Sequence, residues 1–248
     1  MARQKGILKI SGTLDGINYY FIKGVGYARK AGGGFNSKAI RTQPNMQRVR
    51  ENASEFGHCS QVKKCLRLAL MPFLHGYKDS TLHGRMMSLL TTVKALDLVS
   101  ERGFRRVGIG LQTAKGRTLL RQFAFTPHHK LLEAVTKYSH FDWTSQKLSL
   151  SDLKVSDFKS PKPATHIGIS LGVMDFDFEG LTSSLKVSPT QFFAIDSDSI
   201  SFELIPEVVA APTYIGLVVL GIRYYEVINN EVYALNSQIG VGLLDVRI

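Results

Sequence analysis

Short β-favouring runs separated by turn residues occupy the chain from about residue 104 to its end. Clusters of Pro, Gly, Asn and Asp divide the runs, and Asn229-Asn230 stands between two apolar runs as a hairpin turn would. The runs are 106–112, 119–125, 147–150, 165–178, 184–187, 199–205, 214–228, 232–235 and 240–246. Many short strands at this spacing predict an antiparallel β-sandwich domain over residues 104–248.

The preceding segment, residues 42–103, predicts two or three helices. Thr42 can cap the first helix, and Pro44 suits its first turn. We expect Gly57 to interrupt this helix and Pro72 to end the next one. The last helix carries an apolar stripe at helical spacing: Leu82, Met86, Leu89, Leu90, Val93 and Leu96.

Residues 1–41 predict a β-ribbon arm. Asp15-Gly16 is a hairpin signal because both positions tolerate positive φ, and Gly24 marks a second turn. The run Ala31-Gly-Gly-Gly34 predicts a flexible tether. A ribbon of this size is marginal alone, so it must dock on something. The predicted fold class is therefore α+β and mainly β, with an N-terminal hairpin arm, a central helical segment and a C-terminal antiparallel β-sandwich.

Charge is divided unevenly along the chain. Residues 1–130 hold 23 Lys and Arg and 6 Asp and Glu, whereas residues 131–248 hold 8 and 14, which together give the net charge of +11. Like charges within each end repel one another. The positive end of one copy can attract the negative end of a second copy, or a polyanion. Self-association and polyanion binding are the functions that this pattern favours.

The basic arm is the candidate site. Basic groups bind phosphates, and aromatic side chains stack on bases. In the opposing interpretation the aromatics pack the ribbon and the cations are only solvated. The candidate assembly or polyanion-binding residues are Lys5, Lys9, Tyr19, Tyr20, Lys23, Tyr27, Arg29, Lys30, Lys38, Arg41, Arg48 and Arg50.

An acidic segment gives the complementary face. Asp175, Asp177 and Glu179 precede Gly180 as in the first half of an EF-hand loop, but the position that needs a bidentate Glu is Lys186. We therefore expect no metal here, and interpret the three carboxylates as an exposed acidic face on an edge strand. They are the candidate partner face for the basic arm.

No catalytic motif is present in the sequence. The stretch from Gly110 to Thr118 lacks the residue order of a phosphate-binding loop, so Thr113 to Arg117 is expected to form a basic hairpin turn. The seven histidines have no metal-ligand spacing, and no Gly-x-Ser-x-Gly elbow occurs. We expect no enzyme activity, no catalytic residues and no cofactor.

Three segments resemble a known group of proteins. The opening, residues 2–20, and the segment Arg48-Val-Arg-Glu-Asn-Ala-Ser-Glu-Phe-Gly57 are similar to a family of uncharacterised Bacteroidota proteins, as is Ala164 to Leu171. The resemblance implies a bacterial setting and transfers no active site.

Three functions follow as hypotheses. The favoured one is a structural protein that assembles with itself into a filament, tube, shell or phage-like particle. The alternative is nucleic-acid binding by the arm and the helical segment. A third, a carbohydrate- or peptide-binding sandwich, rests on Trp143 alone. With no secretory signal and no apolar run long enough for a membrane span, the expected location is the cytoplasm or a particle assembled inside the cell.

Overall fold

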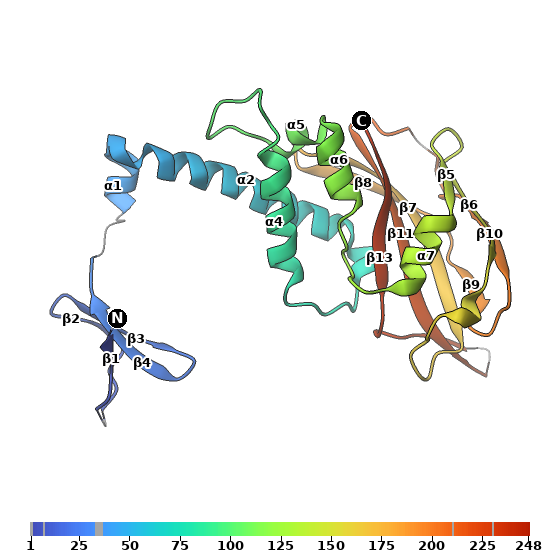
Figure 1. Ribbon diagram of the computed structural model, residues 1–248, viewed down its shortest axis with the longest axis horizontal. Coiled ribbons are helices and arrows are strands. Elements are labelled where there is room, and N and C mark those ends of the chain that lie inside the picture. Colours follow the sequence, from blue (N-terminus) through green and yellow to red (C-terminus); the bar gives the residue numbers. More distant parts are fainter. Residues whose placement is uncertain (1, 7, 33–36, 210, 230) are drawn as a thin grey trace. The chain divides into compact units, whose positions relative to one another are not determined.

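The computed structural model describes residues 2–6, 8–32, 37–209, 211–229 and 231–248 (Figure 1). Contacts divide the chain into two compact units, Met1–Ala53 and Ser54–Ile248. The sequence-based division at residues 41 and 103 stays a prediction. The Gly-rich tether lies partly outside the described residues, since residues 33–36 are not among them.

The N-terminal unit is a small antiparallel sheet followed by short helices. Its strands are β1 (Ala2–Arg3), β2 (Gly12–Leu14), β3 (Ile17–Ile22) and β4 (Val25–Lys30), in the order β1-β4-β3-β2. The helical part comprises α1 (Ser37–Thr42), the 3-10 turn η1 (Pro44–Met46) and the start of α2 (Gln47–Ala69). Hence the predicted arm is a four-stranded sheet.

The second unit begins with helices. They are α2 from Ser54 onward, α3 (Met71–Leu74), α4 (Leu82–Lys94), α5 (Val107–Leu111), α6 (Ala114–Arg121) and α7 (Lys130–Tyr138). The strands that follow are β5 (His140–Asp142), β6 (Lys147–Leu153), β7 (His166–Asp177), β8 (Thr182–Val187), β9 (Gln191–Ala194), β10 (Ile200–Leu204), β11 (Ile215–Ile228), β12 (Glu231–Ala234) and β13 (Gly240–Arg247), with the 3-10 turn η2 (Val155–Asp157) after β6.

Two long strands organise the second unit. β7 and β11 pair along most of their length, from Ile215↔Phe176 to Tyr225↔His166. β12 and β13 both pair with β11, and β8 and β9 both pair with β7, which completes a six-stranded sheet. The strands β10, β6 and β5 form a second, three-stranded sheet in the order β10-β6-β5. Among the described residues of this unit, the strand pairings are antiparallel.

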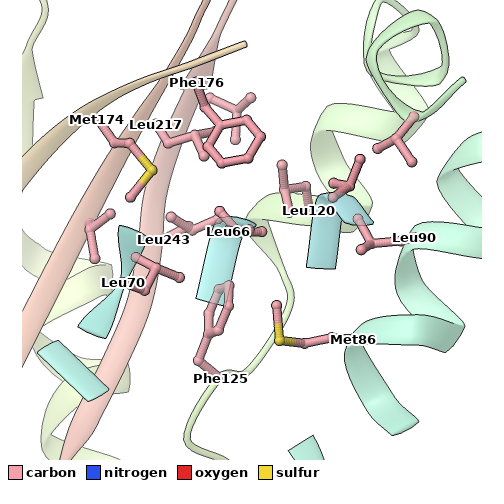
Figure 2. Close-up of a cluster of buried hydrophobic side chains, with 14 of the residues drawn as sticks. Leu66, Leu70, Met86, Leu90, Leu120, Phe125, Met174, Phe176, Leu217 and Leu243 are labelled. Atoms are coloured by element: carbon pink, nitrogen blue, oxygen red, sulfur yellow. The ribbon is translucent and has the colours of Figure 1, made fainter. Parts of the chain in front are cut away.

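Both faces of the large sheet are covered, which explains why β7 and β11 are almost continuously buried. Alternate residues such as Leu217 and Val219 pack with the helices, in the cluster drawn in Figure 2. Their neighbours Val218 and Leu220 pack with the three-stranded sheet and α7. The second packing is the predicted sandwich, so the α+β, mainly β fold class is confirmed.

The strands predicted at 106–112 and 119–125 are wrong, because the first stretch contains α5 and the second contains the end of α6 followed by irregular chain. The hairpin turn predicted at Thr113 is the start of α6, since the Thr113 hydroxyl accepts a hydrogen bond from the Gly116 N–H at 3.0 Å. The alternation of apolar and small residues in Val107-Gly-Ile-Gly-Leu111 imitates a strand. Gly110 instead lets α5 approach α4, since a Cβ there would lie 2.0 Å from the carbonyl oxygen of Val93.

Two helix details also differ from the prediction. α2 runs without interruption through Gly57, which has open space around its Cα. Thr42 ends α1, and Gln43 precedes the 3-10 turn in which Pro44 stands first. A single glycine costs a helix only about 1 kcal/mol, and the burial of Cys59 and Val62 just beyond it outweighs that cost.

Candidate functional site: the basic arm

Two tight turns shape the arm. Asp15 and Gly16 have φ of 46° and 71°, and Lys23 and Gly24 have φ of 48° and 78°. Each pair closes a two-residue hairpin, between Leu14 and Ile17 and between Ile22 and Val25. Positive φ at both central positions matches the right-handed twist of the strands. The Asp15-Gly16 hairpin and the turn at Gly24 are therefore confirmed.

One face of the arm sheet is aromatic and cationic. Residues directly opposite in an antiparallel pair share a face, and Tyr20 lies opposite Tyr27. Their rings stack with centroids 6.0 Å apart, and the Arg29 guanidinium lies 5.5 Å from the Tyr20 ring centroid. Arg3 of β1 lies opposite Tyr27 on the same face. We call these four residues the aromatic face.

The other face is apolar and exposed. It carries Leu14, Ile17, Tyr19 and Phe21, which we call the apolar face, and Lys30 lies directly opposite Ile17 on the same side. Leu14 is 61% exposed, Phe21 43% and Ile17 38%. Among the described residues of 1–53, only Gly26 and Ala39 are buried. The arm sheet thus encloses almost no core of its own.

Gln4 fastens the start of the chain to this sheet. Its side-chain amide donates to the carbonyl oxygens of Ile10 and Tyr27 and accepts from the Ile10 N–H, at 3.0 to 3.2 Å. Gln4 also covers Gly26, where a Cβ would come within 3.2 Å of it. Lys5 and Lys9 follow Gln4 and precede Ile10 in the sequence, and Leu8 is 90% exposed.

The candidate basic residues do not form one patch. Lys23 lies in a turn, Lys30 ends β4, Lys38 and Arg41 belong to α1, and Arg48 and Arg50 to α2. The Arg50 guanidinium donates to the carbonyl oxygens of Ile40 and Gln43, and Arg48 pairs with Glu51 at 3.1 Å. Of the twelve candidates, Tyr20, Tyr27 and Arg29 contact one another. Arg3 also lies beside them, but the sequence did not indicate this, because its position opposite Tyr27 depends on the register between β1 and β4.

The three acidic residues hold local structure. The predicted edge strand is wrong, because Asp175 and Asp177 lie on β7, which pairs with β11 on one side and with β8 on the other. The carboxylate of Asp175 accepts from the N–H groups of Thr213 and Tyr214 at 2.8 Å. Asp177 accepts from the backbone of Glu179 and Gly180 at 2.9 Å, and Glu179 pairs with Arg106 at 3.2 Å. Within the described ranges, no group of three His, Cys, Asp or Glu side chains could hold a metal ion.

Electrostatically the N-terminal unit differs from the rest of the chain. Residues 1–53 contain ten Lys or Arg and two Asp or Glu, whereas residues 54–248 contain 21 and 18. The N-terminal unit is therefore strongly cationic and the second unit nearly balanced. An attraction of the arm for anionic surfaces should be strong at low salt and screened at high salt.

Trp143, the basis of the carbohydrate- or peptide-binding hypothesis, is engaged in packing. Its indole N–H donates to Asp245 at 2.8 Å, its ring meets Phe141 edge to face, and it lies close to Gly216. These contacts explain the tryptophan without a ligand.

Comparisons of the chain with protein families, with curated proteins and with solved structures found no match. In the part of the chain that the structure describes, no helix has the length and apolar character needed to cross a membrane.

Proposed function

We propose that this protein is a non-enzymatic structural protein that assembles with copies of itself through its N-terminal arm. The observation that carries the proposal is the apolar face, with Leu14, Ile17 and Phe21 exposed on a sheet that has almost no core. Exposed apolar residues on a folded sheet mark an interaction surface when they are contiguous. The product is a filament, tube, shell or phage-like particle.

Strand addition is the docking mode that suits this sheet. Its outer strands β1 and β2 each pair on one side only, among the strands that the structure describes. An unpaired edge offers backbone donors and acceptors to a strand of a neighbour. Charge adds to this attraction, because the cationic arm of one copy can approach the acidic second half of another copy.

The test measures the mass of the purified full-length protein by sedimentation velocity and its shape by negative-stain microscopy. We expect assemblies larger than a monomer at about 0.05 M salt that dissociate partly at about 1 M, where the Debye length falls to about 3 Å. The variant Leu14→Ser/Ile17→Ser/Phe21→Ser, hereafter the arm variant, should form smaller species. A strictly monomeric wild type at every salt and protein concentration would overturn the proposal.

A matched control comes from the second unit. Val208 and Val209 are apolar and 52% and 53% exposed, and they lie in the irregular segment after β10. Val208→Ser/Val209→Ser removes two exposed apolar side chains outside the arm and should leave the assembly unchanged. Equal loss in the control and the arm variant would show that general surface hydrophobicity drives association.

A second candidate function is favoured by the aromatic face. The Tyr20–Tyr27 stack flanked by Arg29 and Arg3 combines a stacking platform with cations, which is what single-stranded nucleic acid requires. Both functions can operate together, since the aromatic and apolar faces lie on opposite sides of one sheet.

Fluorescence anisotropy with a labelled single-stranded oligonucleotide tests this second function. Tyr20→Ala should weaken binding by about tenfold, because one stacked base contributes about 1–3 kcal/mol. Tyr19→Ala, a tyrosine of the same strand on the opposite face, is the control and should have little effect. Identical affinities of the two variants and the wild type would exclude the aromatic face as the binding surface.

A further inference from the structure

One edge of the large sheet is formed by β13 and β12, which both pair with β11 on the side away from β7. At β13 this edge is occupied, because the Thr126 hydroxyl bonds the N–H and C=O of Val241. At β12 all four residues, Glu231–Ala234, are exposed. Among the described strands, β12 pairs with β11 and with no other. The large sheet therefore has an open edge at β12.

Two hydrogen bonds of β11 show which way the backbone of β12 points. The Tyr225 carbonyl oxygen accepts the Thr165 N–H at 2.9 Å, and the Val227 N–H donates to the Thr165 hydroxyl at 2.9 Å. Both groups of β11 are thus directed away from β12. Their partners in β12 are Ala234 and Val232. In an antiparallel pair such partners direct their own N–H and C=O groups outward, so Ala234 and Val232 offer them to the open edge.

The side chains around this edge are apolar and acidic. Val232 is 52% exposed, Tyr233 49% and Ile228 46%. Glu226 lies opposite Tyr233, and Glu231 lies opposite Ile228 on the same face. Among the described ion pairs neither glutamate takes part, and the hydrogen bond that Glu231 accepts from the Tyr233 hydroxyl leaves its charge uncancelled. An exposed edge with apolar side chains is a template for an added strand.

Strand β2 of the arm has a matching backbone and the opposite charge. Leu14 and Ile17 flank a two-residue turn and form a hydrogen-bonded pair, so the next residue, Thr13, directs its N–H and C=O away from β3. Residues 1–32 hold six Lys or Arg and one Asp, whereas residues 224–239 hold two Glu and no Lys or Arg. The two open edges therefore attract each other.

We propose that β2 of one copy adds antiparallel to β12 of another copy, with Thr13 opposite Ala234 and Leu14 opposite Tyr233. Thr13 and Ala234 then exchange both of their outward backbone hydrogen bonds. The exposed Leu14 packs against the exposed Tyr233 ring, as directly opposed side chains do in a sheet.

This register forms one continuous row of side chains across the two copies. On the arm, Lys30 lies opposite Ile17, and Ile17 lies opposite Leu14. On the receiving sheet, Tyr233 lies opposite Glu226. The row is therefore apolar in its centre, with a cation at the arm end and a carboxylate at the other end. Three exposed apolar side chains cover one another without bringing like charges together.

The inference rests on the proposed self-assembly and names the surface that receives the arm. The two partners in the contact are different parts of the chain, so the contact is heterologous. Such a contact continues from copy to copy, and gives a ring where it closes and an open polymer where it does not. A closed two-fold dimer is not its product.

A proline tests the backbone part of the contact. Ala234→Pro removes the N–H that Thr13 would accept, and it leaves the pairing with β11 intact because that N–H points outward. It should weaken association by about tenfold or more, because a hydrogen bond is lost and the ring stands in its place. Ala234→Thr keeps the N–H and is the control. Sedimentation velocity at several protein concentrations and about 0.05 M salt measures both.

Neutralising the hairpin tests the charge part. Glu226→Gln/Glu231→Gln should weaken association at about 0.05 M salt and make it less sensitive to added salt. Asp196→Asn/Asp198→Asn removes two exposed carboxylates elsewhere in the second unit, with the same change in net charge, and is the control. Equal weakening by the two double substitutions would overturn the assignment to the β12 edge.

Disulfide trapping tests the register. In a Cys65→Ala background, which removes the half-buried free cysteine, Leu14→Cys and Tyr233→Cys are made as separate full-length proteins and mixed under mild oxidation. The mixed disulfide dimer should form in clear excess over either homodimer. Leu14→Cys mixed with Val208→Cys is the control. An excess of the Tyr233→Cys homodimer, which would mean that two β12 edges pair with each other, would overturn the contact.

The outcomes separate this contact from the proposed function. A wild type that assembles, loses assembly in the arm variant and is unaffected by Ala234→Pro would overturn the β12 contact and leave assembly through the arm standing. A strictly monomeric wild type would overturn both. Circular dichroism of each variant shows whether the substitution has disturbed the fold.

Discussion

The ring of Phe73 lies directly on the backbone of Gly221. A Cβ at Gly221 would come within 2.3 Å of Phe73 Cδ1, and one at Gly172 of the neighbouring strand within 2.8 Å of Phe73 Cζ. Phe73, from the short helix α3, is only 6% exposed. Two glycines on adjacent strands thus form a socket that fixes α3 to the large sheet. A glycine inside a strand is otherwise unfavourable, and the packing of Phe73 explains why Gly221 occurs there.

Filling this socket should destabilise the second unit. Gly221→Ala should lower the free energy of unfolding by about 1–3 kcal/mol, because the added methyl overpacks a closed site. Phe73→Ala should cost about 3–5 kcal/mol through the cavity it leaves. Urea unfolding followed by circular dichroism measures both. Gly57→Ala, at an exposed helical glycine with open space, is the control and should be neutral or slightly stabilising.

The Glu55–Lys94 pair gives a second stability prediction. Lys94→Met should lower the free energy of unfolding by about 3–5 kcal/mol, because it leaves a buried carboxylate without its cation. Glu55→Gln/Lys94→Met should recover much of this loss, since the glutamine oxygen still accepts the Gly103 N–H. Urea unfolding again gives the free energies. Equal loss in the single and double variants would mean that the unpaired charge is not the cause.

Buried histidines make stability depend on pH. Burial lowers the pKa of His58 below 6.5, with Arg106 assisting and Glu179 opposing, and burial also lowers the pKa of His129 against its hydrogen bond with Gln238. The unfolded chain therefore binds protons near pH 6.5 that the folded chain does not. Stability should be complete above that pH and fall as the pH decreases through it.

Urea unfolding at about pH 7.5 and about pH 5.5 measures the decrease in the free energy of unfolding. Each proton taken up on unfolding lowers that free energy by at most about 1.4 kcal/mol per pH unit. His58→Gln should lose less stability over this interval than the wild type, because His129 is then the one of these two buried histidines that still takes up a proton on unfolding. His83→Gln, at an exposed position, is the control. An unchanged pH dependence in His58→Gln would contradict the assignment.

Local chemistry made some parts of this fold predictable. Asp15-Gly16 specifies a turn by its own φ preferences, and the stripe that includes Met86, Leu90 and Val93 faces the core as expected. α5 could not be predicted, because its helical form depends on Gly110 packing against Val93 of α4. The sequence analysis did not predict α7, whose N-cap is a histidine instead of the usual Ser, Thr, Asp or Asn: the His129 side chain accepts the Leu132 N–H.

The candidate site was predictable in composition but not in arrangement. The sequence identified Tyr20, Tyr27 and Arg29, yet the separation of Tyr19 from Tyr20 onto opposite faces and the addition of Arg3 depend on register between strands. The loop between α4 and α5 gave no signal, because in sequence it resembles the continuation of an apolar helix. Only the burial of Asp97 reveals that the chain turns there.

β13 forms part of one edge of the large sheet. β13 pairs with β11 and, among the described strands, with no other. On its open side the buried Thr126 hydroxyl accepts the Val241 N–H at 2.7 Å and donates to the Val241 carbonyl oxygen at 3.3 Å. The hydroxyl thus takes the place of a neighbouring strand and blocks pairing with another chain at this point.

Thr126→Val keeps the shape but removes this hydroxyl. It should lower the free energy of unfolding by about 1–3 kcal/mol, because a buried N–H and C=O lose their partner. Thr126→Ser keeps the hydroxyl and should cost no more than about 1 kcal/mol for the lost methyl. Urea unfolding gives the stabilities, and light scattering at rising protein concentration should show faster aggregation for Thr126→Val alone. If Thr126→Ser aggregates as fast, the methyl rather than the hydroxyl protects the edge.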